Sequence, residues 1–126
     1  MKNKLLGTGE EGYNPLRKFR VIMQGLRYSA SDFSVLHKFM ISVVILIPVV
    51  IYNGALDASI IVLATVFMLS AEMFNTSIEA ICDFIHPEYH DKIGIIKDIA
   101  AAATGLAIFA WLLVLVVEIV EVVGHI

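Results

Sequence analysis

Residues 99–117 read IAAAATGLAIFAWLLVLVV, a run of 19 residues without a charged side chain. A helix needs roughly 20 mostly apolar residues to cross a bilayer. Two further stretches, Phe39–Leu56 and Ala58–Ala71, also lack charge. The whole chain is 59% hydrophobic and 17% charged, far from the usage of soluble proteins. The sequence therefore predicts an all-α integral membrane protein with three transmembrane helices, at about 38–56, 58–83 and 98–119.

The distribution of the nine Lys and Arg residues predicts the topology. Seven lie within the first 38 residues, and Lys92 and Lys97 lie between the second and third predicted transmembrane helices. The connection at Asn53–Asp57 and the tail at Glu118–Ile126 contain no basic residue. Because basic segments stay on the cytoplasmic side, we expect a multi-pass protein with a cytoplasmic N-terminus and a periplasmic or extracellular C-terminus.

The N-terminal segment is predicted to lie outside the membrane core. Residues 1–14 contain three glycines and indicate a flexible lead. Pro15 suits the first position of a helix, and over residues 15–30 the apolar side chains fall mainly on one face. This pattern predicts an amphipathic helix on the cytoplasmic leaflet, and packing against the protein's own transmembrane helices is the alternative. Lys38 is interpreted as a lysine that reaches the membrane interface.

Length and composition also limit the possible classes of protein. The 126 residues are expected to form a single domain, and the single cysteine, Cys82, excludes an internal disulfide. The sequence has no Gly-rich phosphate loop and no His/Cys spacing typical of zinc. Nucleic acid is not an expected partner, because the topology already explains the basic N-terminal segment.

Four polar side chains form a stripe on the second predicted transmembrane helix. Glu72, Asn75, Glu79 and Asp83 follow one another at spacings of 3, 4 and 4 residues. At about 100° per residue they lie on one face of the helix. Ionisable groups at membrane depth cost several kcal/mol unless they face a protein interior, a metal or water. The stripe therefore predicts a reaction or transport site.

The spacing of the stripe suggests chemistry at two depths. Glu72 and Glu79 lie roughly 10 Å apart along the helix axis, too far to share a proton. Further polar residues follow at the level of the cytoplasmic surface: Glu88, Tyr89, His90, Lys97 and Asp98. A deep base, a metal-binding carboxylate and a lysine suit phosphoryl transfer from a water-soluble donor to a lipid hydroxyl. A proton or ion pathway, and a stripe satisfied by hydrogen bonds between helices, are the alternatives.

The motifs resemble those of the prokaryotic diacylglycerol kinase family, which includes the undecaprenol kinases. The family pattern Glu-x-x-Asn-[Thr/Ser]-x-Ile-Glu-x-x-x-Asp matches Glu72–Asp83, and Gly25-Leu-Arg27 is similar to a motif on the family's surface helix. The sequences Glu88-Tyr-His90 and Lys97-Asp98 follow with matching spacing. The resemblance covers about residues 15–120.

The resemblance implies a homotrimer in the bacterial inner membrane that transfers the γ-phosphate of Mg-ATP to a lipid alcohol, diacylglycerol or undecaprenol. It implies that Glu72 is the general base, that Asn75 orients the reaction centre, and that Glu79 holds Mg²⁺. It also implies active sites between subunits. The residues that match the family's nucleotide contacts are Glu88, Tyr89, His90, Lys97 and Asp98, besides Glu79 at the metal.

One position departs from the family pattern. The family carries a second metal-binding glutamate where this chain has Phe33, with Asp32 just before it. A displacement of one residue rotates a helical side chain by about 100°, so Asp32 is expected to be either a replacement metal ligand or a helix N-cap. A relative that binds lipid or nucleotide without turnover, and an intramembrane ion or proton conductor, are the alternative functions.

Overall fold

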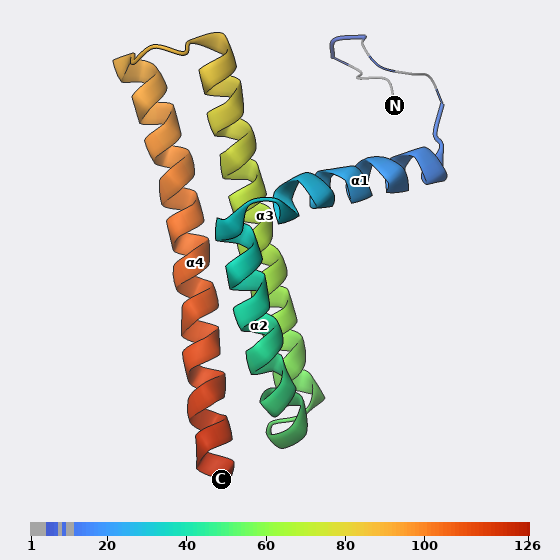
Figure 1. Ribbon diagram of the computed structural model, residues 1–126, viewed down its shortest axis with the longest axis vertical. Helices are drawn as coiled ribbons and strands as arrows, with labels where there is room; N and C mark the ends of the chain where they lie inside the picture. The colour runs from blue at the N-terminus through green and yellow to red at the C-terminus, as the bar shows by residue number, and fades with distance from the viewer. Residues whose placement is uncertain (1–4, 8, 10–11) are drawn as a thin grey trace. The chain divides into compact units, whose positions relative to one another are not determined.

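The structure is a computed structural model that describes residues 5–7, 9 and 12–126. In these residues the secondary structure consists of four α-helices: α1 (Pro15–Ala30), α2 (Phe33–Tyr52), α3 (Ala55–Ile85) and α4 (Asp91–His125) (Figure 1). The all-α prediction with three long apolar helices is confirmed. The chain forms two compact units, one that ends at Phe33 and one that spans Ser34–Ile126. The assignment of the whole chain to a single domain stays a prediction.

The N-terminal unit contains α1. The Asn14 side chain accepts hydrogen bonds from the backbone N–H groups of Leu16 and Arg17, which satisfies donors that have no partner within the helix. Pro15 occupies the first helical position, where its missing N–H costs nothing. The predicted flexible lead over residues 1–14 includes residues 1–4, 8 and 10–11, which lie outside the described part of the chain.

Helices α2, α3 and α4 are each long and apolar enough to cross a membrane. At 1.5 Å per residue the 31 residues of α3 and the 35 of α4 extend about 45 and 50 Å, beyond a hydrocarbon core of roughly 30 Å. The helices therefore continue past the predicted spans into their polar flanks. The tail predicted from Glu118 onward is part of α4 as far as His125, because helical hydrogen bonding does not end where the apolar run ends.

The turn between α2 and α3 explains where α2 ends. Asn53 and Gly54 both donate their backbone N–H groups to the Val49 carbonyl, which closes the helix. Gly54 has a φ of +104°, a conformation that glycine adopts without steric cost. The helix accordingly stops at Tyr52, and the next begins at Ala55, within the residues predicted as the end of the first transmembrane helix.

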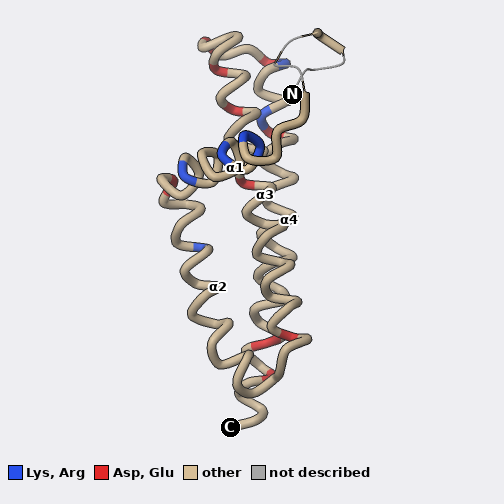
Figure 2. The backbone as a smooth tube through the Cα atoms, turned by 90° about the vertical axis from the view of Figure 1, so that its right-hand side faces the viewer, with Lys and Arg blue, Asp and Glu red and all other residues tan. Residues whose placement is uncertain are grey.

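Helices α3 and α4 run antiparallel and lie side by side (Figures 1 and 2). The α3–α4 loop lies at one end of this unit, and the α2–α3 turn and the C-terminus lie at the other. In Figure 2 the middle of α4 carries no charged residue, in agreement with the apolar run in the sequence.

The core of the second unit contains side chains from all three long helices. Its buried apolar members are Val49, Ala58, Ile61, Met68, Trp111, Leu115 and Val122. Ser42 of α2 lies at the centre of a buried polar group, 2.8 Å from Trp111 Nε1 of α4 and 2.9 Å from Thr65 Oγ1 of α3. Because lipid offers no hydrophobic drive for helix association, packing and interhelical hydrogen bonds of this kind hold the helices together.

Candidate active site

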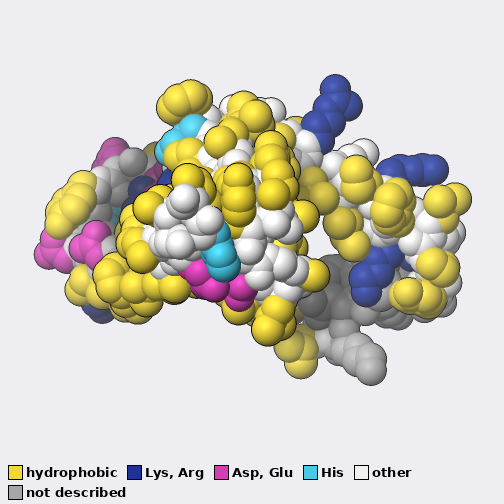
Figure 3. Space-filling model, turned by 90° about the horizontal axis from the view of Figure 1, so that it is seen from below, with side chains coloured by type: hydrophobic (Ala, Val, Ile, Leu, Met, Phe, Trp, Pro, Cys, Tyr) yellow, Lys and Arg dark blue, Asp and Glu magenta, His cyan; other side chains and the backbone are white. Residues whose placement is uncertain are grey.

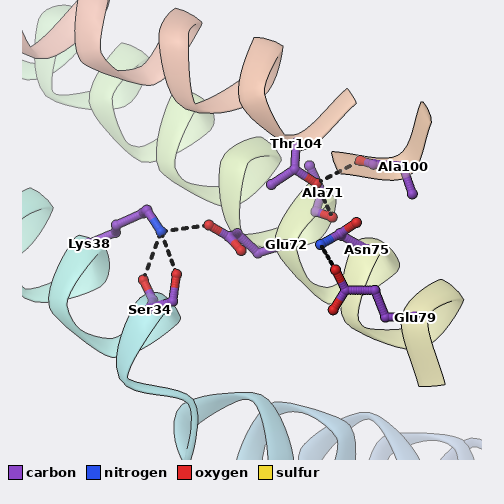
Figure 4. Close-up of polar contacts among 8 residues, drawn as sticks. All are labelled: Ser34, Lys38, Ala71, Glu72, Asn75, Glu79, Ala100 and Thr104. Atoms are coloured by element: carbon purple, nitrogen blue, oxygen red, sulfur yellow. Dashed lines mark hydrogen bonds and ion pairs between the residues drawn. The ribbon is translucent and has the colours of Figure 1, made fainter. Parts of the chain in front are cut away.

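Glu72 is the buried member of the polar stripe on α3. Its Oε1 lies 2.6 Å from Nζ of Lys38 on α2, and the two side chains are only 10% and 12% exposed. The Lys38 ammonium also donates to the Ser34 carbonyl oxygen at 3.0 Å and to Ser34 Oγ at 2.7 Å (Figure 4). The ion pair compensates two charges that would each be costly to bury alone.

Lys38 has a different environment from the interfacial one expected from the sequence. It lies on the α2 face that carries the buried residues Val35, Ser42 and Val49, at spacings of 3, 4 and 7 residues. The one signal in the sequence that would have revealed this is the helical period of that face, which turns Lys38 inward. Ser34 was missed as well, because its role depends on the position of the ammonium.

Asn75 and Glu79 lie on the following turns of α3 and contact each other. Asn75 Nδ2 donates to Glu79 Oε1 at 3.2 Å, while Glu79 is exposed. The Asn75 side-chain oxygen is buried and has no hydrogen-bond donor among the residues that the structure describes. In Figure 4 the Glu72 side chain points towards Lys38, and the Asn75 and Glu79 side chains meet separately from it. The stripe thus presents a buried carboxylate, an amide and an exposed carboxylate in sequence along one helix.

The polar residues beyond the stripe lie at the α3–α4 loop. His90 Nδ1 accepts a hydrogen bond from the Lys92 backbone N–H and caps α4. His86 Nδ1 lies 2.7 Å from the Glu88 carbonyl oxygen, and Glu88 and Tyr89 are exposed. His90 therefore keeps only its Nε2 atom for a ligand.

Lys97 of α4 contacts the last member of the stripe. Its Nζ lies 2.5 Å from Asp83 Oδ1 of α3, and Asp98 beside it is exposed. The hydrogen bond from Lys97 to Asp83 raises the pKa of this lysine, which precedes the charge-free run at Ile99–Val117. Lys97 is therefore cationic at neutral pH.

Asp32 belongs to the N-terminal unit, whereas Glu79 belongs to the second unit. The Asp32 backbone N–H donates to the Ser29 carbonyl at 3.1 Å in the turn that follows α1. Its role as a metal ligand stays a prediction.

Acidic side chains also gather at the opposite end of the second unit, near the C-terminus (Figure 3). Carboxylate oxygens of Asp57, Glu118 and Glu121 lie within 4.8 Å of one another. Glu118 is buried, and its Oε2 accepts a hydrogen bond of 2.9 Å from Asn53 Nδ2. Glu118 was expected in the tail at Glu118–Ile126, so its contact with Asn53 was not predicted.

Three long apolar helices, with a buried ion pair and a polar stripe between charge-free segments, define a membrane protein with a polar site among its helices. The family model described as prokaryotic diacylglycerol kinase matches residues 20–120, and the chain belongs to this family of lipid kinases. The resemblance inferred from the motifs is thereby confirmed. Comparisons with curated proteins and with solved structures found no match.

Proposed function

We propose that the protein is a lipid kinase that transfers the γ-phosphate of Mg-ATP to diacylglycerol or undecaprenol. The observation that carries the proposal is Glu72, a buried carboxylate within the family motif of a membrane-crossing helix. One of its oxygens is held by Lys38, and the other, Oε2, has no hydrogen-bond donor in the described part of the chain. A carboxylate held in this way is suited to accept the proton of a lipid hydroxyl.

In the proposed reaction Glu72 acts as the general base. The lipid oxygen forms a bond to the γ-phosphorus as its proton passes to Glu72, and the bond from the γ-phosphorus to its bridging oxygen breaks to release ADP. Asn75 is assigned to orient the reaction centre, since its side-chain oxygen is buried and has no donor among the described residues. Both residues lie on α3, so one helix sets their separation.

Glu79 is the residue of the second unit that we assign to Mg²⁺, with Asp32 as a further candidate ligand. Glu79 fits a hard cation because it is an exposed carboxylate, one oxygen of which accepts a hydrogen bond from the Asn75 amide. Bound Mg²⁺ would neutralise charge on the phosphate oxygens of ATP. Lys97, held cationic beside Asp83, is assigned to the phosphates. The remaining nucleotide contacts are assigned to Glu88, Tyr89, His90 and Asp98.

We place the protein in the bacterial inner membrane, with the N-terminus and the α3–α4 loop in the cytoplasm, where ATP is available. The distribution of basic residues supports this orientation. We assign α1 to the cytoplasmic surface of the membrane as an amphipathic helix. We further propose a homotrimer with active sites between subunits, because Ala101–Ala103 of α4 are exposed in the single chain and small residues allow close helix packing.

The test is transfer of labelled γ-phosphate from Mg-ATP by the purified protein in detergent, with diacylglycerol and undecaprenol offered separately. Glu72→Gln is expected to abolish the transfer. Glu121→Gln is the matched control, since it removes the same charge near the C-terminal end of α4 and is expected to retain full activity. Label in neither lipid, from folded wild-type protein, would overturn the proposal. Dissipation of a pH gradient in liposomes would then favour an ion or proton conductor.

A further inference from the structure

The Lys38–Glu72 pair joins α2 to α3 across 34 residues of sequence. We propose that Lys38 is a positioning residue: it holds Glu72 as a carboxylate and fixes the direction of its free oxygen towards the lipid hydroxyl. The proposal rests on the proposed kinase function, in which Glu72 is the base. The Lys38–Glu72 contact itself is a property of the folded chain and does not depend on that function.

The hydrogen bonds of Lys38 argue against direct phosphate binding. A lysine ammonium has three N–H donors and no acceptor. The three are matched by three acceptors, namely Glu72 Oε1 and the two oxygen atoms of Ser34. With no N–H group remaining, the ammonium acts on Glu72 rather than on a phosphate oxygen.

Ser34 makes the position of the ammonium specific. Its carbonyl oxygen and Oγ both contact Nζ, and Ser34 lies one helical turn before Lys38 on α2. These two contacts with one residue restrict the Lys38 side chain, which is otherwise flexible along its four-carbon stem. The carboxylate of Glu72 is consequently held at Oε1 by a donor that is itself fixed.

Lys38 also places a positive charge against the buried carboxylate of Glu72. Burial disfavours a carboxylate unless a cation or hydrogen-bond donors compensate its charge. Lys38 is the cation in contact with Glu72, and the pair is about nine-tenths buried. A base must be unprotonated before it accepts the lipid proton, so removal of Lys38 removes the base in its working form. When Glu72 accepts the lipid proton, the Lys38 ammonium keeps its three N–H protons.

The kinetic test compares Lys38→Met, which removes the charge and keeps the length, with Lys38→Arg, which keeps the charge. We expect Lys38→Met to lower kcat at least about tenfold with the KM for ATP unchanged, and Lys38→Arg to recover part of the loss. Lys18→Met is the matched control, because it removes a lysine of α1, and we expect no change in kcat. An unchanged kcat, or a change confined to the KM for ATP, would overturn the proposal.

An infrared measurement tests the same proposal without turnover. The difference between wild type and Glu72→Gln isolates the bands of Glu72, and the same difference in the Lys38→Met background isolates them without the ammonium. We expect carboxylate bands in the first difference and the band of a protonated carboxyl in the second. Carboxylate bands in both would contradict the role of Lys38. If wild-type protein transfers no phosphate, the kinase proposal fails, while this measurement still decides the effect of Lys38 on Glu72.

Ser34→Ala provides a second variant if Lys38→Met does not fold. It removes the Oγ acceptor and leaves the ammonium, the ion pair and the backbone contact in place. We expect kcat to fall several-fold with an unchanged KM for ATP. An unaltered kcat in Ser34→Ala would show that fixing the ammonium has no effect on the reaction.

Discussion

Lys97 of α4 donates a hydrogen bond of 2.5 Å to Asp83 of α3 and so connects the two helices beside their loop. The pair lies at the end of the polar stripe, where the proposed nucleotide site begins. The bond to Asp83 raises the pKa of Lys97 above its ordinary value of 10.5. The contribution of the Lys97–Asp83 pair to stability is thus fully present below pH 10.5, and it is lost as the pH rises through the raised pKa of Lys97 in the folded state.

Asp83→Asn is therefore expected to lower the thermal stability of the protein slightly at pH 7 and to have no effect at a pH above the raised pKa of Lys97. The effect is small because the pair is partly exposed to solvent. Thermal unfolding of wild type and Asp83→Asn in detergent at both pH values measures the difference. A difference in melting temperature that persists unchanged at high pH would contradict this account of the pair.

Glu72→Gln is expected to abolish phosphoryl transfer while ATP binding stays largely intact. The substitution removes a base without altering the shape of the side chain, and Glu72 is buried away from the exposed loop residues assigned to the nucleotide. Equilibrium binding of a fluorescent ATP analogue checks this. Loss of nucleotide binding in the folded variant would show that Glu72 lies at the nucleotide and not at the lipid hydroxyl.

Asp32→Ala separates the two roles considered for this residue. If Asp32 holds a metal, the substitution is expected to lower the rate constant at least tenfold, which corresponds to about 1.4 kcal/mol of barrier. If Asp32 acts as an N-cap, stability falls by about 1 kcal/mol and the rate constant of the folded protein stays nearly the same. Our proposal predicts the first outcome, and kinetics together with thermal unfolding of the same preparation distinguish the two.

Trp111→Phe is expected to destabilise the protein by about 1 kcal/mol. The substitution keeps an aromatic ring in the core and removes the Nε1–H that donates to Ser42 Oγ between α4 and α2. Unfolding in mixed micelles measures the loss. In a Ser42→Ala background the same substitution is expected to have a smaller effect, since the acceptor is already absent.

Asn53→Ala is expected to destabilise the protein more than Trp111→Phe does, by about 1–3 kcal/mol. The substitution removes the Asn53 amide that donates a hydrogen bond to the buried Glu118 carboxylate. Asn53→Asp is not an equivalent test, since it would add a further carboxylate to the group formed by Asp57, Glu118 and Glu121. Unfolding of Asn53→Ala alone and together with Glu118→Gln checks the interpretation. Glu118→Gln is expected to recover part of the stability, since a neutral amide costs less to bury unpaired than a carboxylate.

The sequence alone was sufficient for the number of long helices and for the polar stripe. Both depend on local properties: runs without charge, and spacings of 3 and 4 residues that place Glu72, Asn75 and Glu79 on one face of a helix. The helix bounds were less accurate. Gly54 with its positive φ follows the end of α2 at Tyr52, whereas the predicted helix ran to about residue 56, and α4 continues beyond residue 119 to His125. Hydropathy does not indicate where helical hydrogen bonding ends.

What the sequence by itself determined is thus the family, the all-α membrane class and the order of candidate groups along α3, because each is encoded in residues close together in the chain. Only the tertiary structure decided the partners of those groups. Lys38 with Glu72, Lys97 with Asp83 and Asn53 with Glu118 pair across 34, 14 and 65 residues. The physical reason is that such contacts depend on which helix faces pack together, and the hydropathy of each helix does not specify its neighbour.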